Sequence, residues 1–182
     1  MKKFKMIVMT LCVLLITVGC SNNDNGDNEG TGETNSNVTA REVLNEIQNA
    51  MAMKYDIAVE DGVLTGYHIM DLTSAEDTQA FFLAENFDLA DIKEGYVLEP
   101  MMSMVRSELV IVVEAMNAAA VNQVVSSLES VRAAQEATWS QYLPDQYAFV
   151  QNNQIVTHGD FVLYATSEHV EEIVAAFEAQ VR

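Results

Sequence analysis

The apolar positions switch between helical and extended spacing, and the first helical stretch runs from Thr39 to about Met53. Apolar residues recur there every three or four positions, as on one face of an amphipathic helix. Thr39 and Glu42 have the spacing of a capping box, and Val38 is placed to pack against Val43 as a hydrophobic staple. The pattern therefore predicts a helix that begins at Thr39.

Residues 63–86 give a weak pattern in their first half and a helical pattern in their second. Residues 63–72 follow an Asp-Gly turn and are predicted to be partly extended. Thr73 and Glu76 repeat the capping-box spacing ahead of apolar residues that include Phe81. They predict a second helix that ends near residue 86.

Four extended runs follow, in two pairs. The first pair is 96–105 and 109–113, which are apolar or β-branched and separated by a short polar turn. The second pair is 155–156 and 161–165, and His158-Gly159 between them suits a two-residue hairpin turn. Each pair is predicted to form an antiparallel hairpin.

Two more helices are predicted around the second pair of strands. Residues 117–142 return to helical spacing, and Pro144 is expected to end that helix because proline cannot continue it. Ser167 is placed to cap a last helix, which presents an apolar face as far as Val181.

The predicted order is helix, helix, strand, strand, helix, strand, strand, helix. Strands joined in hairpins imply an α+β fold, with a largely antiparallel four-stranded sheet and helices packed on it. Residues 38–182, roughly 145 positions, are enough for a single domain with its own core.

Residues 1–19 have the features of an export signal. A basic start precedes the uncharged run MIVMTLCVLLITVG, which is too short to span a bilayer and has the length of a signal-peptide core. The run ends at Gly19-Cys20, and this junction resembles the lipobox of bacterial lipoproteins, although Thr17 stands where that family usually has Leu. The resemblance implies cleavage after Gly19 and diacylation of Cys20. The alternatives are an uncleaved anchor and an ordinary signal peptide.

Residues 20–37 are predicted to be the lipidated Cys20 followed by a disordered polar tether. The tether sequence, SNNDNGDNEGTGETNSN, contains no apolar residue, so it cannot bury surface to offset the entropy of ordering. As a flexible coil it would span roughly 20–25 Å. The expected location is the extracytoplasmic face of the cell membrane, with the acyl chains on Cys20 as the membrane contact.

Composition adds a strong acidic bias. The 182 residues include 9 Lys and Arg and 27 Asp and Glu, a net charge of −18; loss of the three lysines in residues 1–19 would leave six basic residues and a net charge of −21. Such a chain is poorly suited to nucleic-acid binding, because neutralising the phosphates requires clustered Lys and Arg side chains. Its 2 cysteines cannot build a disulfide scaffold or a four-thiolate zinc site.

Several short segments resemble a family, in the order Pro100-Met101-Met102, the strand Glu108–Glu114, Tyr142-Leu143-Pro144-Asp145-Gln146-Tyr147, Gly159–Leu163 and Thr166-Ser167-Glu168. Together they are similar to a small domain of unknown function found in lipoproteins of Gram-positive bacteria, most closely from Tyr96 to Phe177. The resemblance implies a surface lipoprotein domain. It carries over no activity and no catalytic residue.

The candidate metal ligands are few. His68, His158 and His169 form no pair at helical metal-ligand spacing, so neither a zinc site nor a cofactor is expected. Methionines cluster at residues 101, 102 and 104, and such thioethers can bind Cu(I) outside the cytoplasm. Alternating methionines in a strand more often fill a core, and core packing is the prediction.

Trp139, Tyr142 and Tyr147 are the candidate binding surface. Tyrosine and tryptophan combine an apolar body with a polar edge, which suits an interface. The alternative is that the three rings pack on the sheet where the long helix ends.

No catalytic motif is present: there is no nucleophile elbow, phosphate loop or dinucleotide fingerprint. The sequence therefore predicts a non-catalytic binding or accessory module of the cell envelope, with an envelope protein or a small ligand as its partner. The alternatives are a surface hydrolase that uses carboxylates and a mainly structural envelope component.

Overall fold

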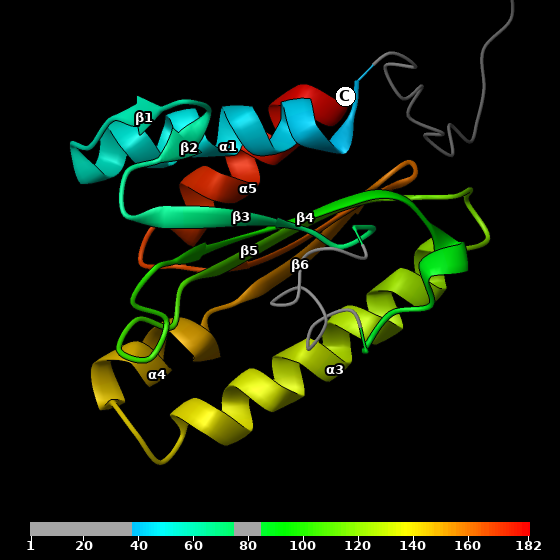
Figure 1. Cartoon of the computed structure of the whole chain (residues 1–182). Helices are drawn as coiled ribbons and strands as arrows, with labels where there is room; N and C mark the ends of the chain where they lie inside the picture. The colour runs from blue at the N-terminus through cyan, green and yellow to red at the C-terminus, as the bar shows by residue number, and fades with distance from the viewer. Residues whose placement is uncertain (1–37, 75–84) are drawn as a thin grey trace, which may run out of the picture. The chain divides into compact units, whose positions relative to one another are not determined.

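A computed structural model describes residues 38–74 and 85–182 (Figure 1). The elements, in chain order, are α1 (Ala40–Tyr55), β1 (Val59–Glu60), β2 (Val63–Leu64), β3 (Tyr67–Asp71), the 3₁₀ turn η1 (Leu89–Asp91), β4 (Ile92–Pro100), β5 (Leu109–Ala115), α3 (Val121–Trp139), α4 (Pro144–Gln151), β6 (Gln154–His158), β7 (Phe161–Thr166) and α5 (Val170–Val181). This is the expected α+β class. Within the described ranges no helix is both long enough and apolar enough to cross a bilayer.

The main sheet has five strands in the order β3-β4-β5-β7-β6, all antiparallel, and β1 and β2 form a separate two-stranded sheet. The prediction of a four-stranded sheet was therefore wrong, as was the element order. Residues 63–72, which had no clear period, contain two strands. Gly66 separates them with a φ of +84°, a conformation that glycine adopts without strain.

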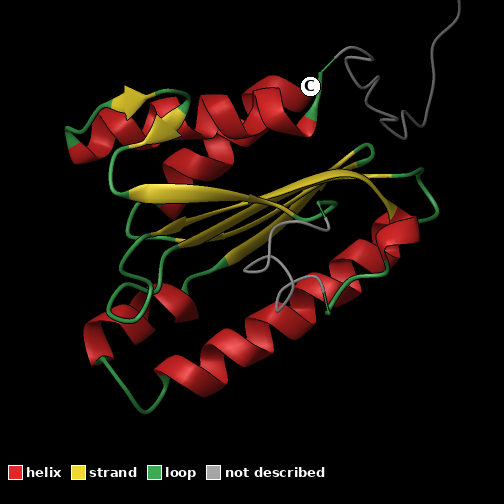
Figure 2. Cartoon of the chain, viewed as in Figure 1, coloured by secondary structure: helices red, strands yellow, loops and turns green. Residues whose placement is uncertain are grey.

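Helices cover both faces of the main sheet (Figure 2). α1 and α5 lie on one face and α3 lies on the other. The central strand β5 is buried along its whole length: Val110 and Val112 contribute to the core under α1 and α5, whereas Ile111 and Val113 contribute to the core under α3. This alternation is the period of two expected of a strand between two layers.

The first helix begins as predicted. Thr39 Oγ1 accepts a hydrogen bond from the Glu42 N–H at 3.2 Å, and the Glu42 carboxylate accepts one from the Thr39 N–H at 2.9 Å. These two bonds form the capping box, which satisfies N–H groups that a helix start leaves free. The helix that Thr73 and Glu76 predict falls largely on residues 75–84, outside the described residues.

Three element boundaries differ from the predictions. The strand predicted at residues 96–105 corresponds to β4, which ends at Pro100 instead of residue 105. It ends there because proline has no N–H to continue the ladder. The long helix ends at Trp139 instead of continuing to residue 142, and Pro144 begins the separate helix α4 instead of ending α3, since proline is well suited to a first helical position. The turn between β6 and β7 is Gly159-Asp160, with φ +55° at Gly159, and His158 is still in β6.

The last helix also starts later than Ser167 predicts. α5 begins at Val170, with His169 as its first flanking residue. Ser167 still contributes to the helix entry, because its Oγ accepts a hydrogen bond from the His169 N–H at 3.0 Å. Ser167 is fully buried at this point, so the bond satisfies a hydroxyl that water cannot reach.

Candidate binding site at the β3 edge

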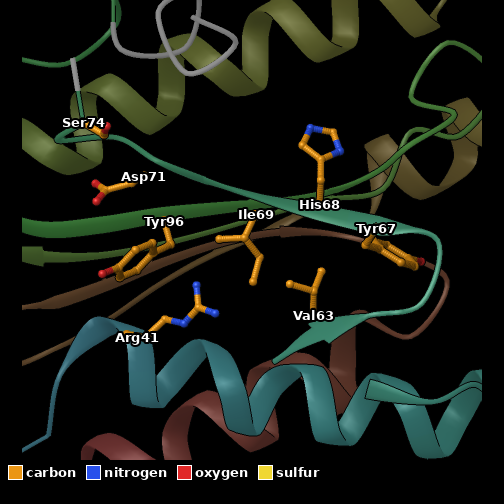
Figure 3. A pocket seen from close by; sticks show the side chains of 8 residues that line it. All are labelled: Arg41, Val63, Tyr67, His68, Ile69, Asp71, Ser74 and Tyr96. Carbon is orange, nitrogen blue, oxygen red and sulfur yellow. The ribbon is translucent and has the colours of Figure 1, made fainter. Parts of the chain in front are cut away.

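A cavity of about 600 Å³ lies beside β3, the first strand of the main sheet (Figure 3). Its volume is within the range of ligand pockets. The close view shows the Arg41, Ile69 and Tyr96 side chains on the α1 side of β3 and the His68 ring on the opposite side. The cavity therefore follows the edge of the strand instead of entering one face of the sheet.

Among the residues that the structure describes, β3 has one paired edge and one open edge. Its neighbour on the paired side is β4, where the Leu72 N–H donates to the Gly95 carbonyl at 2.9 Å and the Met101 N–H donates to the Gly66 carbonyl at 2.9 Å. Alternate residues of a strand direct their backbone groups to opposite sides. Tyr67, Ile69 and Asp71 therefore direct their N–H and C=O groups away from β4, and no strand of the described ranges pairs with that side.

Arg41 supplies the positive charge of the cavity. It lies in the first turn of α1, with its guanidinium carbon 5.4 Å from the centre of the Tyr96 ring and Nη2 donating to the Gly62 carbonyl at 3.2 Å. The ring face is favourable for a cation. These two contacts hold the guanidinium at the cavity while leaving most of its five N–H donors unused.

Arg41 differs from the other basic residues of the described part of the chain. That part has six Lys and Arg side chains, and five of them form ion pairs with carboxylates. Arg41 has no carboxylate partner among the described residues. In so acidic a chain, an unpaired guanidinium beside a cavity is the most distinctive electrostatic feature of this region.

The carboxylates around Tyr96 are occupied by other donors. Asp71 accepts hydrogen bonds from the Thr73 N–H at 2.8 Å and the Thr73 hydroxyl at 2.7 Å. Glu94 accepts from the Tyr96 hydroxyl at 2.8 Å and from the N–H of the first residue of α1 at 2.8 Å. Burial and the bond to Glu94 raise the pKa of Tyr96 to about 12, so its hydroxyl remains a donor at neutral pH.

A second polar cluster is centred on Glu108, at the start of β5. Glu108 forms an ion pair with Arg106 and accepts a hydrogen bond from the Tyr55 hydroxyl. The same hydroxyl lies 2.9 Å from Ser167 Oγ, and Arg106 Nη2 donates to the Tyr67 hydroxyl at 2.7 Å. Every polar side chain of the cluster has a partner, and the Glu108 side chain is only 7% exposed.

The electrostatics of this cluster follow from its burial. Desolvation, reinforced by the nearby Glu108 carboxylate, raises the pKa of Tyr55 and of Tyr67 strongly above the ordinary tyrosine value. Both hydroxyls therefore stay protonated, that of Tyr55 as a donor to Glu108 and that of Tyr67 as an acceptor from Arg106. Arg106 lies 5.1 Å from the Tyr67 ring centre, and the His169 ring packs 5.0 Å from that of Tyr55.

The cavity contains none of the three aromatic residues expected at a binding surface. Trp139 is buried and its Nε1–H donates to Gln135 Oε1 at 2.8 Å; its ring lies 5.7 Å from that of Tyr142. Tyr142 is 54% exposed and Tyr147 is half-buried in α4. A binding role for these three residues therefore stays a prediction. Tyr142 is the most accessible of them.

The Tyr142–Tyr147 segment has a structural task that the sequence did not suggest. Gln146 Oε1 accepts a hydrogen bond from the Ser107 N–H at 2.8 Å, and the Gln146 carbonyl accepts one from the Ser107 hydroxyl at 3.0 Å. The segment thereby fastens the β4–β5 connection to α4. Ser107 is buried, so these bonds are needed to satisfy it.

The methionine prediction was wrong. Met101, Met102 and Met104 are not core residues of a strand: they lie in the turn after β4 and are 72%, 66% and 82% exposed. The strand ends at Pro100, and the chain then turns, with the Val105 N–H donating to the Met102 carbonyl at 3.1 Å.

The histidines are separated in the fold. His68 is on β3, where Nε2 lies 3.2 Å from Glu99 Oε1 but without the alignment of a hydrogen bond; His158 ends β6 and His169 precedes α5. In the described ranges, no group of three or more His, Cys, Asp or Glu side chains is placed to hold a metal ion.

The fold and the cavity define a small α+β domain whose antiparallel sheet has an open edge beside an unpaired arginine. The chain belongs to the family of the domain of unknown function DUF4358, whose model matches residues 69–167. The match includes residues 69–71 of β3 and, from the Glu108 cluster, Arg106, Glu108 and Ser167, whereas Arg41, Tyr55 and Tyr67 precede it. No curated protein and no solved structure matches the chain.

Proposed function

We propose that the protein is a lipid-anchored extracytoplasmic binding module that takes up an extended, carboxylate-bearing peptide segment of an envelope partner along β3. The observation that carries this proposal is the position of Arg41: the only unpaired cation of the described residues lies in the cavity that follows the open edge of the sheet.

The open edge supports a strand as the bound element. Tyr67, Ile69 and Asp71 offer main-chain donors and acceptors at the alternate positions that an added strand would use. Main-chain pairing of this kind provides affinity for any extended chain, and side-chain contacts then provide selectivity. β3 also contains no proline or lysine, the residues that commonly protect an edge from pairing.

Arg41 supports a carboxylate on the bound segment. Guanidinium and carboxylate groups match in shape and form paired charge-assisted hydrogen bonds. The Tyr96 ring and the Gly62 carbonyl already orient the guanidinium, so less side-chain freedom is lost on binding. The protein's own carboxylates in this region accept bonds from neutral donors, which leaves the arginine available.

The sequence of residues 1–37 supports the location. A basic start, a short apolar run and a cysteine directly after Gly19 together favour acylation of Cys20, and a polar tether would hold the domain away from the bilayer. Replacing Cys20 by Ala is expected to move the protein out of the membrane fraction of fractionated cells. Retention of that variant in the membrane would refute the anchor.

Site-specific photocrosslinking tests the binding site. A photoreactive amino acid at Ile69, on the open edge, is expected to yield a discrete adduct in membranes, and mass spectrometry should map it to an acidic, extended segment of the partner. The matched control is the same label at Gln123, exposed on α3 on the other side of the sheet.

Arginine substitutions then test the charge. Arg41→Gln is expected to lower the yield of the Ile69 adduct about tenfold, since a hydrogen bond between charged groups contributes about 1.5–3 kcal/mol. Arg182→Gln, which removes an exposed arginine already paired with Glu178, should leave the yield unchanged. Equal adducts at Ile69 and Gln123, or an adduct that does not depend on Arg41, would refute the proposal.

A further inference from the structure

The turn between β4 and β5 carries three methionines that point to soft-metal chemistry. Met101, Met102 and Met104, here called the methionine loop, lie within four positions of the chain and are 66–82% exposed. Two other methionines, Met51 and Met70, are buried and fill the core, the usual use of this residue. The side chains of the methionine loop are therefore not used as core packing, unlike those of Met51 and Met70.

The backbone of the loop is held at both ends. The Met101 N–H donates to the Gly66 carbonyl at 2.9 Å at one end, and at the other Ser107 is fastened to Gln146 by bonds of 2.8 Å and 3.0 Å. Between these ends the Met102–Val105 hydrogen bond closes a turn. Three long, flexible thioether side chains thus project from one fixed turn.

We propose that the methionine loop binds a monovalent soft metal ion, Cu(I), through the Met101, Met102 and Met104 sulfurs. Soft thioether ligands favour Cu(I) over the hard cations that carboxylates bind. A net charge of −18 raises the local concentration of any cation around the domain. The proposal is independent of the peptide site at β3 and of Arg41.

The test uses the full-length chain with Cys12→Ser and Cys20→Ser in every sample, because thiolates would otherwise compete for the metal. Methionine methyl groups are isotope-labelled and followed by NMR during titration with Ag(I) as silver nitrate in chloride-free buffer, since Ag(I) is a redox-stable substitute for Cu(I). A second titration uses Cu(I) under ascorbate without oxygen.

The expected result is a saturable shift of the methyl signals of Met101, Met102 and Met104 at one ion per chain. Replacing all three by Leu should abolish this binding while keeping the loop apolar, so docking of a protein partner through apolar contact would survive. The matched control, Met53→Leu with Met116→Leu, removes two exposed methionines outside the loop and should bind as before.

Three results would overturn the proposal. These are the absence of a saturable shift, equal binding by the triple-leucine variant, and equal shifts of Met53 and Met116. Circular dichroism and Trp139 fluorescence of each variant establish that the fold is intact, so that loss of binding is attributed to the sulfurs.

Discussion

Two arginines of this domain lie over tyrosine rings of neighbouring strands and differ in what else they contact. Arg106 lies 5.1 Å from the Tyr67 ring of β3, and Arg41 lies 5.4 Å from the Tyr96 ring of β4. Arg106 also forms an ion pair with Glu108. Arg41 has no such partner in the described part of the chain.

The difference separates a structural site from one that is available to a ligand. Around Glu108, each hydroxyl and charge is paired within the protein, and a buried network of this kind holds the packing in one arrangement. At Arg41, the Gly62 carbonyl and a ring face are the only groups engaged among the described residues, and the guanidinium borders a cavity. We therefore propose that the same pair of residue types serves stability in one place and recognition in the other.

The largest expected effect is on the paired site. Glu108→Ala should lower the free energy of unfolding by about 2–4 kcal/mol, because it leaves Arg106 and the Tyr55 hydroxyl without their shared acceptor. Urea unfolding followed by circular dichroism measures this. A loss smaller than about 0.5 kcal/mol, typical of surface substitutions, would mean that the Glu108 cluster is not structural.

The pH dependence of the free energy of unfolding, which the buried tyrosines affect, provides a second test of the comparison. Because the pKa of Tyr55 is raised in the folded protein, the folded state keeps a proton that the unfolded state loses above about pH 10, the ordinary tyrosine pKa. The free energy of unfolding should therefore be insensitive to this group below that pH and fall above it. Tyr96, whose pKa is raised to about 12, contributes a fall of the same sign that levels off near that pH, whereas the fall due to Tyr55 continues above it.

Tyr55→Phe should lower the free energy of unfolding by about 1–2 kcal/mol at neutral pH, through loss of the bonds to Glu108 and Ser167. It should also make the alkaline decrease shallower, because it removes a group that keeps its proton in the folded state. Urea unfolding at about pH 8 and about pH 11 measures both effects. An alkaline decrease as steep as that of the unsubstituted protein would show that folding does not raise the pKa of Tyr55.

Elements with a strong local signal could be predicted from the sequence. The capping box of α1 and the apolar runs of β5 and β7 specify their structure locally, and all three are present. The pattern around β3 is ambiguous because His68 interrupts a short apolar stretch, and the pairing of β3 with β4 depends on residues some 30 positions away. Likewise, the sequence predicted that Pro144 ends the long helix, whereas α3 ends at Trp139 and Pro144 begins α4.

The candidate site depends on contacts that no local pattern contains. Arg41, Gly62 and Tyr96 come from separate elements, and whether an arginine lacks a carboxylate partner is a property of the tertiary structure. The methionine loop was misassigned because the end of β4 at Pro100 was not recognised, although proline is a signal for that end. The aromatic residues around α4 were chosen by residue type, and type alone does not specify exposure.

The smallest expected effect on stability is at Arg41, and it is the most direct test of the comparison. Arg41→Gln should change the free energy of unfolding by less than about 0.5 kcal/mol, because it breaks no ion pair and the remaining amide can still reach the solvent. Urea unfolding alongside Arg106→Gln, expected to cost about 1–3 kcal/mol by removing the ion-pair partner of the buried Glu108, provides the matched measurement. If the two variants lose equal stability, Arg41 is a structural residue like Arg106, and the proposal of a binding site in the cavity at β3 is refuted. If Arg41→Gln is neutral and still abolishes the Ile69 adduct, the arginine is reserved for a ligand.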